Sequence, residues 1–192
     1  MIRKTMLGVA ALLFVVPAQA DIFDINAGDK SFRASLFGAL PELFSVPTGQ
    51  YDVGAVLRPE KNEDLLQVYV GALLTGEYGS RDSWGYATGI GARAVYVGLD
   101  HDSGGALALG GMFETRLPNA PEIGLSGYIY GAPEALSFGE LKEYLEIAPS
   151  IDYKFTPDAA LYVGYRYIRY DIGAQDDLER DSSGHIGLRL RF

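Results

Sequence analysis

The chain has 192 residues, no cysteine, and 25 acidic against 16 basic residues, for a formal net charge of −9. A chain of this length fits one domain of ordinary size, and the acidic balance argues against nucleic acid or an anionic membrane surface as the main partner. The absence of cysteine excludes disulfide bonds, so stability must come from the fold itself. Aromatic residues make up 12% of the chain and there are 24 glycines, a composition typical of outer-membrane barrels.

Residues 1–20 predict a secretory signal peptide. Arg3 and Lys4 precede an apolar run over residues 6–16, and Ala18-Gln19-Ala20 supplies a small-residue cleavage site. The alternative, a transmembrane anchor, is disfavoured because a helix needs about 20 apolar residues to span a bilayer. We therefore expect export, cleavage near Ala20, and a single mature domain over residues 21–192.

Beyond residue 20, apolar and polar residues alternate with the period of two that marks strands. From Leu145 to Phe155 every odd position is apolar and every even position is small or charged. In the last eight residues, Ile186, Leu188, Leu190 and Phe192 share one face, with arginines on the other. The ten predicted strands are Ile22–Ala27, Phe32–Gly38, Tyr51–Arg58, Leu65–Thr75, Tyr86–Gly98, Ala106–Leu117, Ile123–Tyr130, Tyr144–Phe155, Leu161–Asp171 and His185–Phe192.

The connections between these strands also alternate in character. Segments 59–64, 131–143 and 173–184 are longer and mostly acidic, whereas 118–121 and 156–159 are short. Long outer loops and short periplasmic turns are typical of an all-β fold, the transmembrane antiparallel up-and-down β-barrel. We expect ten strands, or eight if the first hairpin stays outside the wall. Connections 39–48 and 76–85 are longer than periplasmic turns usually are.

Charged side chains of both signs fall on the faces opposite the apolar ones. In a narrow lumen they are costly unless paired, so we expect salt bridges, with Arg93, Arg166 and Arg189 opposite Glu114, Glu146 and Asp152. A channel whose lumen selects small polar solutes is the alternative, although a barrel of eight to ten strands is barely wider than its own side chains. The predicted inward residues are Arg33, Asp52, Arg58, Gln67, Arg93, Glu114, Arg116, Glu146, Asp152, Lys154, Arg166 and Arg189.

Aromatic side chains gather in the carboxy-terminal half of the chain. Because rings with a polar tip prefer the level of the lipid headgroups, we expect interfacial girdles on the outer surface. The predicted girdle residues are Tyr128, Tyr130, Tyr144, Tyr153, Phe155, Tyr162, Tyr165, Tyr167 and Tyr170.

The sequence offers little for catalysis. His101-Asp102-Ser103 faintly resembles an outer-membrane lipid A deacylase, but Gly104 and Gly105 follow, and Asp and Ser belong in such a turn for backbone reasons. His185 has no carboxylate in an obvious register. The acidic loops lack the spacing of a calcium-binding loop. We expect no catalytic, cofactor or metal site, and a membrane-embedded lipid hydrolase remains a second alternative.

Several segments resemble the YfaZ family of Gram-negative outer membrane proteins. They are residues 128–138 (YIYGAPEALSF), 144–146, 162–168 (YVGYRYI), 104–111 and 187–192 (GLRLRF), whereas the half before residue 85 matches only in pattern. The resemblance implies a signal peptide, a small monomeric barrel and outer-membrane residence, and it brings no catalytic or ligand residues. The expected partners are outer-membrane lipid, lipopolysaccharide and the barrel assembly machinery, which would contact the last strand with its terminal Phe192.

Overall fold

The computed structural model describes residues 21–40, 48–59, 64–78, 85–99, 102–172 and 178–192, with the side chains of 78 and 178–181 left aside. The predicted signal peptide, its cleavage site and His101 lie outside the described residues. No helix in this part of the chain is long and apolar enough to cross a membrane. In chain order the elements are β1 (Ile22–Gly28), β2 (Phe32–Ala39), β3 (Gly49–Arg58), β4 (Leu65–Tyr78), β5 (Tyr86–Gly98), β6 (Ser103–Leu117), β7 (Ala120–Ala132), the short 3₁₀ helix η2 (Glu134–Leu136), β8 (Ser137–Gly139), β9 (Leu141–Thr156), β10 (Ala159–Ile172) and β11 (Leu178–Arg191).

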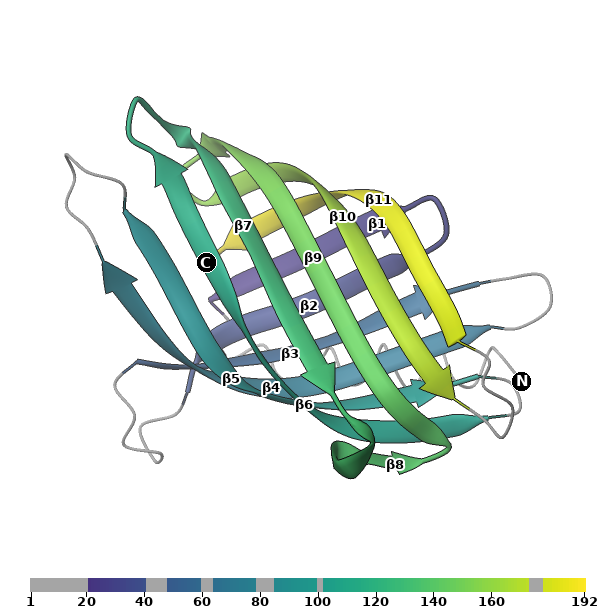
Figure 1. Cartoon of the computed structure of the whole chain (residues 1–192). Coiled ribbons are helices and arrows are strands. Elements are labelled where there is room, and N and C mark those ends of the chain that lie inside the picture. Colours follow the sequence, from purple (N-terminus) through teal and green to yellow (C-terminus); the bar gives the residue numbers. More distant parts are fainter. Residues whose placement is uncertain (1–20, 41–47, 60–63, 79–84, 100–101, 173–177) are drawn as a thin grey trace.

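Ten long antiparallel strands close into a barrel (Figure 1). Neighbours along the chain pair with one another, and β1 pairs with β11 to close the ring. The predicted ten-strand transmembrane barrel is confirmed. The eight-strand alternative is wrong, because β1 lies in the wall between β2 and β11 rather than outside it.

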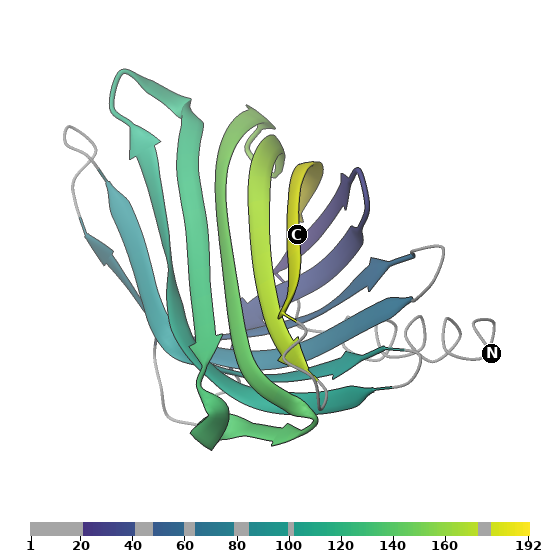
Figure 2. The same ribbon diagram turned by 45° about the vertical axis from the view of Figure 1, so that its right-hand side comes forward.

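The barrel has two different ends, which can be followed in Figures 1 and 2. We call one the turn end: there, residues 118–119 and 157–158 connect neighbouring strands, and Phe192 follows β11. We call the other the loop end: it carries η2, β8 and the tight turn from β1 to β2, where the Gly28 amide donates to the Ser31 carbonyl at 2.8 Å.

Strands β6 and β11 extend further towards the loop end than the alternation predicts. β11 begins at Leu178 and pairs with β10 as far as Asp171, so the predicted loop over 173–184 is shorter than expected. β6 begins at Ser103 rather than at Ala106. Period-two hydropathy marks only the stretch in which one face meets lipid, whereas backbone pairing continues into polar residues beyond it.

The segment between β7 and β9 completes the wall at the loop end. β7 pairs with β6 only as far as Leu109, and beyond that point the chain turns through η2. β8 then pairs with residues Gly104–Ala106 of β6. Gly139 ends this segment with φ of 71°, a conformation that glycine adopts without steric strain. Most of the predicted outer loop 131–143 is therefore ordered wall.

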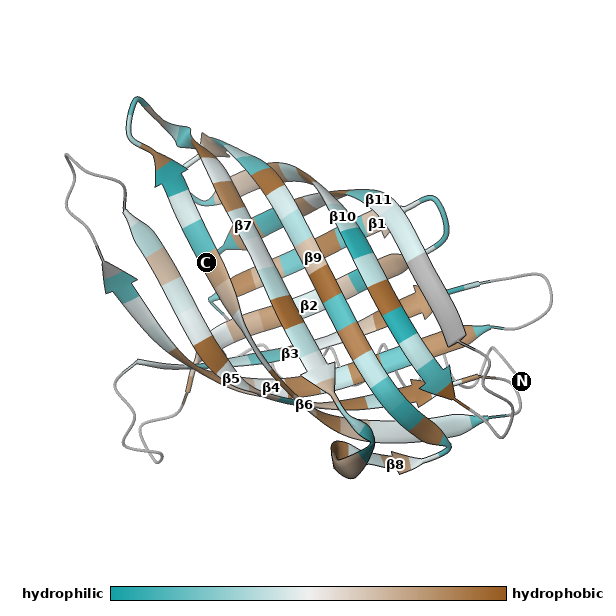
Figure 3. Cartoon of the chain, viewed as in Figure 1, coloured by the Kyte–Doolittle hydropathy of each residue, from teal (hydrophilic) through white to brown (hydrophobic). Residues whose placement is uncertain are grey.

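Hydrophobic and hydrophilic residues alternate along many strands (Figure 3), and large apolar side chains are exposed on the outer surface of the wall. Ile151 is 52% exposed, whereas its neighbour Asp152 is 1% exposed and points inward. Leu107, Leu109 and Phe113 face outward from β6 in the same way. The predicted facing of both strands is confirmed.

Candidate functional site

The half of the lumen nearer the loop end is filled with apolar side chains. They come from β4, β5, β6, β7, β9 and β10, and Leu136 of η2 packs against them. The expectation that charges fill the lumen is wrong for this half, because closely packed side chains leave no room for hydrated groups. The buried residues are Leu65, Val95, Val97, Ala106, Ala108, Ala132, Leu141, Ile168 and Ile172.

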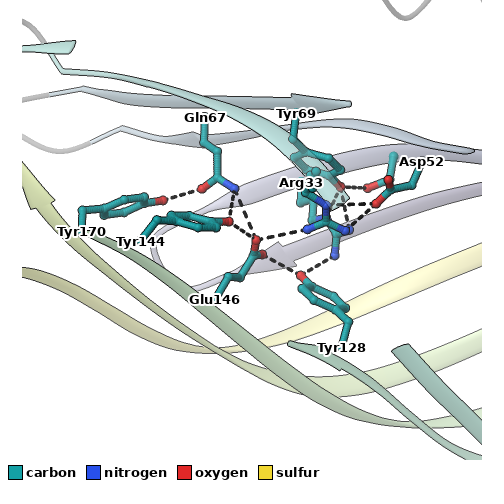
Figure 4. Close-up of polar contacts among 10 residues, drawn as sticks. Arg33, Asp52, Gln67, Tyr69, Tyr128, Tyr144, Glu146 and Tyr170 are labelled. Atoms are coloured by element: carbon teal, nitrogen blue, oxygen red, sulfur yellow. Dashed lines mark hydrogen bonds and ion pairs between the residues drawn. The ribbon is translucent and has the colours of Figure 1, made fainter. Parts of the chain in front are cut away.

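Next to this apolar core lies a polar network centred on Glu146 of β9 (Figure 4). The Glu146 side chain is fully buried. It accepts a hydrogen bond from the Tyr128 hydroxyl at 2.7 Å and another from the Tyr144 hydroxyl. Gln67 Nε2 lies 3.4 Å from Glu146 Oε2, and the Tyr170 hydroxyl donates to Gln67 Oε1 at 2.5 Å. A buried carboxylate with several donors is stable in its charged form.

Two arginines stack with the tyrosine rings of this network. The Arg33 guanidinium donates to the Tyr69 hydroxyl at 2.6 and 2.9 Å and to the Tyr128 hydroxyl at 2.7 Å. The Arg93 guanidinium lies 3.8 Å from the ring centre of Tyr130 and 4.2 Å from that of Tyr69. Cation–π contacts of this kind strengthen when the cation is removed from water.

Arg93 is also the cation of the most buried ion pair. Its Nη2 lies 2.5 Å from Asp52 Oδ2, and its Nη1 lies 3.4 Å from Glu146 Oε2. Asp52 lies on β3 and Arg93 on β5, and Gly71 of β4 is the partner of both in the strand register. A Cβ at Gly71 would overlap Asp52 Oδ1. Glycine in the middle strand therefore lets the guanidinium cross one strand to reach the carboxylate.

The same arrangement occurs nearer the turn end. Arg116 of β6 and Asp152 of β9 are both register partners of Gly124 in β7. Arg116 Nη1 lies 2.5 Å from Asp152 Oδ2, and its Nη2 lies 2.9 Å from Glu114. Arg116 and Glu114 are partly exposed here, at 20% and 26% of their side-chain surface.

A third cluster joins β1 to β10 and β11. The Tyr162 hydroxyl crosses Gly187 and donates to Asp24 at 2.6 Å, and Asn26 donates to the same hydroxyl at 2.8 Å. Arg189 Nε lies 3.2 Å from Asp24 Oδ2. Nearby, Arg166 donates to Asn26 Oδ1 at 3.3 Å and to the Ser31 hydroxyl.

The turn-end half of the lumen holds a cavity of about 120 Å³. Arg33, Asp52 and Arg93 form its floor, and residues of the 157–158 turn lie at its mouth. The lumen is therefore closed towards the loop end by apolar side chains and hollow towards the turn end.

The structure brings most of the predicted lumen residues together, but not always in the predicted pairs. Arg93 does contact Glu146. The pairing predicted for Arg166 is wrong, because its partners are neutral, and Arg189 contacts Asp24 rather than one of the three expected carboxylates. Arg58 lies half-buried at the loop-end terminus of β3, and Lys154 lines the cavity.

The predicted aromatic girdle is only partly correct. Tyr153, Phe155 and Tyr165 are about half exposed on the outer face, as expected. The lumen instead contains five tyrosines at even positions of β7, β9 and β10, all of them part of the networks described above. These inward residues are Tyr128, Tyr130, Tyr144, Tyr162 and Tyr170.

Several polar residues of the lumen were not predicted from the sequence. Asp24 and Asn26 lie on the short β1, and Ser31, Ser35 and Tyr69 look unremarkable in isolation. The period of two could have assigned Ser35 to the inward face of β2, since Arg33, which was predicted to point inward, shares that face.

Among the described residues, no group of three or more His, Asp or Glu side chains is arranged to hold a metal ion. His185 lies at the edge of the cavity with its ring 5.8 Å from that of Tyr162, and its Nδ1 has no hydrogen-bond partner. Within the described part of the chain, no carboxylate hydrogen-bonds to this ring.

A family model described as YfaZ precursor matches residues 2–192. The chain belongs to the YfaZ family. This confirms the resemblance seen in the carboxy-terminal half and extends it over the half before residue 85. No curated protein matches the chain.

Solved structures with a similar course of the chain are outer-membrane proteins. The NanC porin is 14% identical, with a TM-score of 0.42, over 91% of this chain and all of that one. Neisserial surface protein A is 15% identical, with a TM-score of 0.36, over 91% and 95%. Outer membrane phospholipase A from Escherichia coli is 11% identical, with a TM-score of 0.37, over 95% and 96%. Likenesses at this level say nothing about function.

Proposed function

We propose that this YfaZ-family protein is an integral outer-membrane barrel with a structural or surface-interaction role, and that it conducts no solute. The observation that carries this proposal is the apolar core in the loop-end half of the lumen. Val97 and Ala108 are fully buried there, with Leu65 and Leu141 packed around them. Ions crossing the barrel would have to shed water among these side chains, at a prohibitive free-energy cost.

The polar network, like the apolar core, closes the lumen to solutes. The Arg33 and Arg93 guanidinium groups hydrogen-bond or stack with side chains from β3, β4, β7 and β9, so they bridge the lumen from wall to wall. A selectivity lining instead presents charges to a continuous aqueous path. Paired charges of this kind stabilise the closed wall rather than bind a passing solute.

Conductance across a planar bilayer tests the proposal. The refolded protein, shown to be inserted by its shifted gel mobility before boiling, should carry no current above that of the bare membrane. A matched variant in which Val97, Leu65 and Leu141 are all replaced by glycine removes the apolar core and should leak if it folds. Steady single-channel currents from the wild-type protein, altered by Arg93→Met, would establish the solute channel instead.

The apolar outer face supports a location in the outer membrane, with the turn end towards the periplasm. The short 118–119 and 157–158 connections fit the periplasmic side of such barrels. The partners we propose are outer-membrane lipid and lipopolysaccharide around the wall, and the barrel assembly machinery at β11 and Phe192. Membrane fractionation should place the mature protein with outer membranes. Its recovery in the soluble periplasmic fraction would contradict this location.

We also propose that the protein is not an enzyme. The lipid hydrolase alternative would need a nucleophile, a base and a group that orients the base. Ser126 and Ser150 hydrogen-bond each other at 2.8 Å, and His185 Nδ1 has no hydrogen-bond partner among the residues described. Incubation with radiolabelled phospholipid should release no fatty acid. Release that disappears in His185→Ala or His101→Ala would overturn this conclusion.

A further inference from the structure

We propose that the turn-end cavity binds a small free anion that carries phosphate or carboxylate groups. This inference goes beyond the structural role, and it rests on the cations at the mouth of the cavity. Lys154 of β9 and Arg189 of β11 are both register partners of Ala160 in β10, so they share the inner face across one small residue. Arg116 and Arg191 line the same cavity.

Two of these four cations form no direct ion pair with any of the residues that the structure describes. Arg116 pairs with Asp152 and Glu114, and Arg189 pairs with Asp24. No ion pair or hydrogen bond joins the Lys154 ammonium or the Arg191 guanidinium to any other described side chain. Asp158 lines the mouth but forms no ion pair with either of them.

Like charges held close together repel one another unless an anion lies between them. Lys154 interacts electrostatically with Arg116 and Arg191, both cations, and with the carboxylates of Glu114 and Asp152. Both of these carboxylates already accept from Arg116. The repulsion within the cluster is therefore only partly offset by the protein itself.

A hydrogen-bond donor without a partner supports an anion site in the same cavity. Arg116 Nε is buried and has no hydrogen-bond partner, although the side chain lines the cavity. Asp52 Oδ1, at the floor, and Asp152 Oδ1, next to Arg116, are buried acceptors without a partner. An anion would be repelled by these two oxygens and attracted by the cations, so it would bind nearer the mouth, between Lys154, Arg191 and Arg116.

The shape of the cavity decides between a free anion and a lipid headgroup. The volume of about 120 Å³ holds several water molecules or one small molecule. All four cations line the cavity, and Lys154 and Arg189 lie beside the buried Ala160 on the inner face of the wall, which the strands separate from the lipid. Because the loop-end half is packed with apolar side chains, the ligand would enter and leave through the turn end.

Isothermal titration of inorganic phosphate and of succinate into the refolded protein, in a non-ionic detergent, tests the proposal. At least one of the two anions should bind with a stoichiometry of one. Lys154→Gln and Arg191→Gln should each weaken that binding by roughly tenfold, since each removes one charge-assisted contact. Lys154 is only partly buried and Arg191 is exposed, so both variants should fold.

Lys30→Gln is the matched control, because Lys30 is an exposed lysine in the turn between β1 and β2, at the opposite end of the barrel. It should leave binding within twofold of the wild type. The proposal is overturned if neither anion binds saturably, or if Lys30→Gln weakens binding as much as Lys154→Gln. Competition by phosphatidylglycerol, but not by phosphatidylcholine, in the micelles would assign the site to a lipid headgroup instead. The conductance experiment is independent of all these outcomes.

Discussion

Two parts of the lumen contain the same ion-pair arrangement in different surroundings. In each, an arginine reaches across a glycine in the middle strand to an aspartate two strands away: Arg93 over Gly71 to Asp52, and Arg116 over Gly124 to Asp152. Arg93 is 2% exposed and stacked between tyrosine rings, whereas Arg116 is 20% exposed beside a cavity. The geometry of an ion pair is thus set by the strand register, while its energetic importance depends on whether water reaches it.

Removing the buried arginine should lower the free energy of unfolding more than any other change considered below. Arg93→Met leaves Asp52 and Glu146 as buried carboxylates without their cation, and we expect the free energy of unfolding to fall by about 3–5 kcal/mol. Arg116→Met should cost about 1–3 kcal/mol, because water from the cavity can replace part of its hydrogen bonding. Urea titration in lipid vesicles, followed by the gel mobility shift, measures both. Equal losses would show that the two pairs are equally desolvated.

The comparison also requires that these side chains face the lumen. Ile151→Arg places a charge on the lipid side of the wall and should destabilise the barrel by about 2–4 kcal/mol. Ser150→Arg, one residue earlier, directs the charge into the hollow turn-end half and should be milder. The same urea titration compares the two variants. Similar losses would mean that the inner and outer faces of β9 have been exchanged.

Substitutions of the two glycines should have the smallest effects on stability. A methyl group at Gly71 would collide with an aspartate that the packed network holds in place, so Gly71→Ala should cost about 1–3 kcal/mol. At Gly124 a Cβ would lie 2.5 Å from the tip of Arg116, which can move into the cavity, and 2.6 Å from Asp152 Oδ1, both farther than a Cβ at Gly71 would lie from Asp52 Oδ1. The overlap is smaller, so Gly124→Ala should cost about 1 kcal/mol or less. Unfolding midpoints of the two alanine variants, measured side by side, decide this. A larger loss at Gly124 would contradict the difference in packing.

Much of the wall could be predicted from the sequence. Each strand that borders lipid must expose apolar side chains at every second position, so the alternation from Leu145 to Phe155 predicted both a strand and its inner face. The same rule could have separated the tyrosines. Tyr162 and Tyr165 differ by an odd number of residues on one strand, so they cannot both face the lipid, and the structure places Tyr162 inside.

The sequence alone determined that this chain forms an antiparallel barrel, of ten strands or eight, which residues of its clearest strands face lipid, and that it resembles the YfaZ family. Only the tertiary structure decided which inward residues meet. Arg166 contacts Asn26 and Ser31, more than 130 positions away, because β1 closes against β11. The apolar core at the loop end and the cavity at the turn end have the same origin. Residues in one layer of the lumen come from strands across the whole chain, and the stagger of those strands, which no local pattern records, determines which of them share a layer.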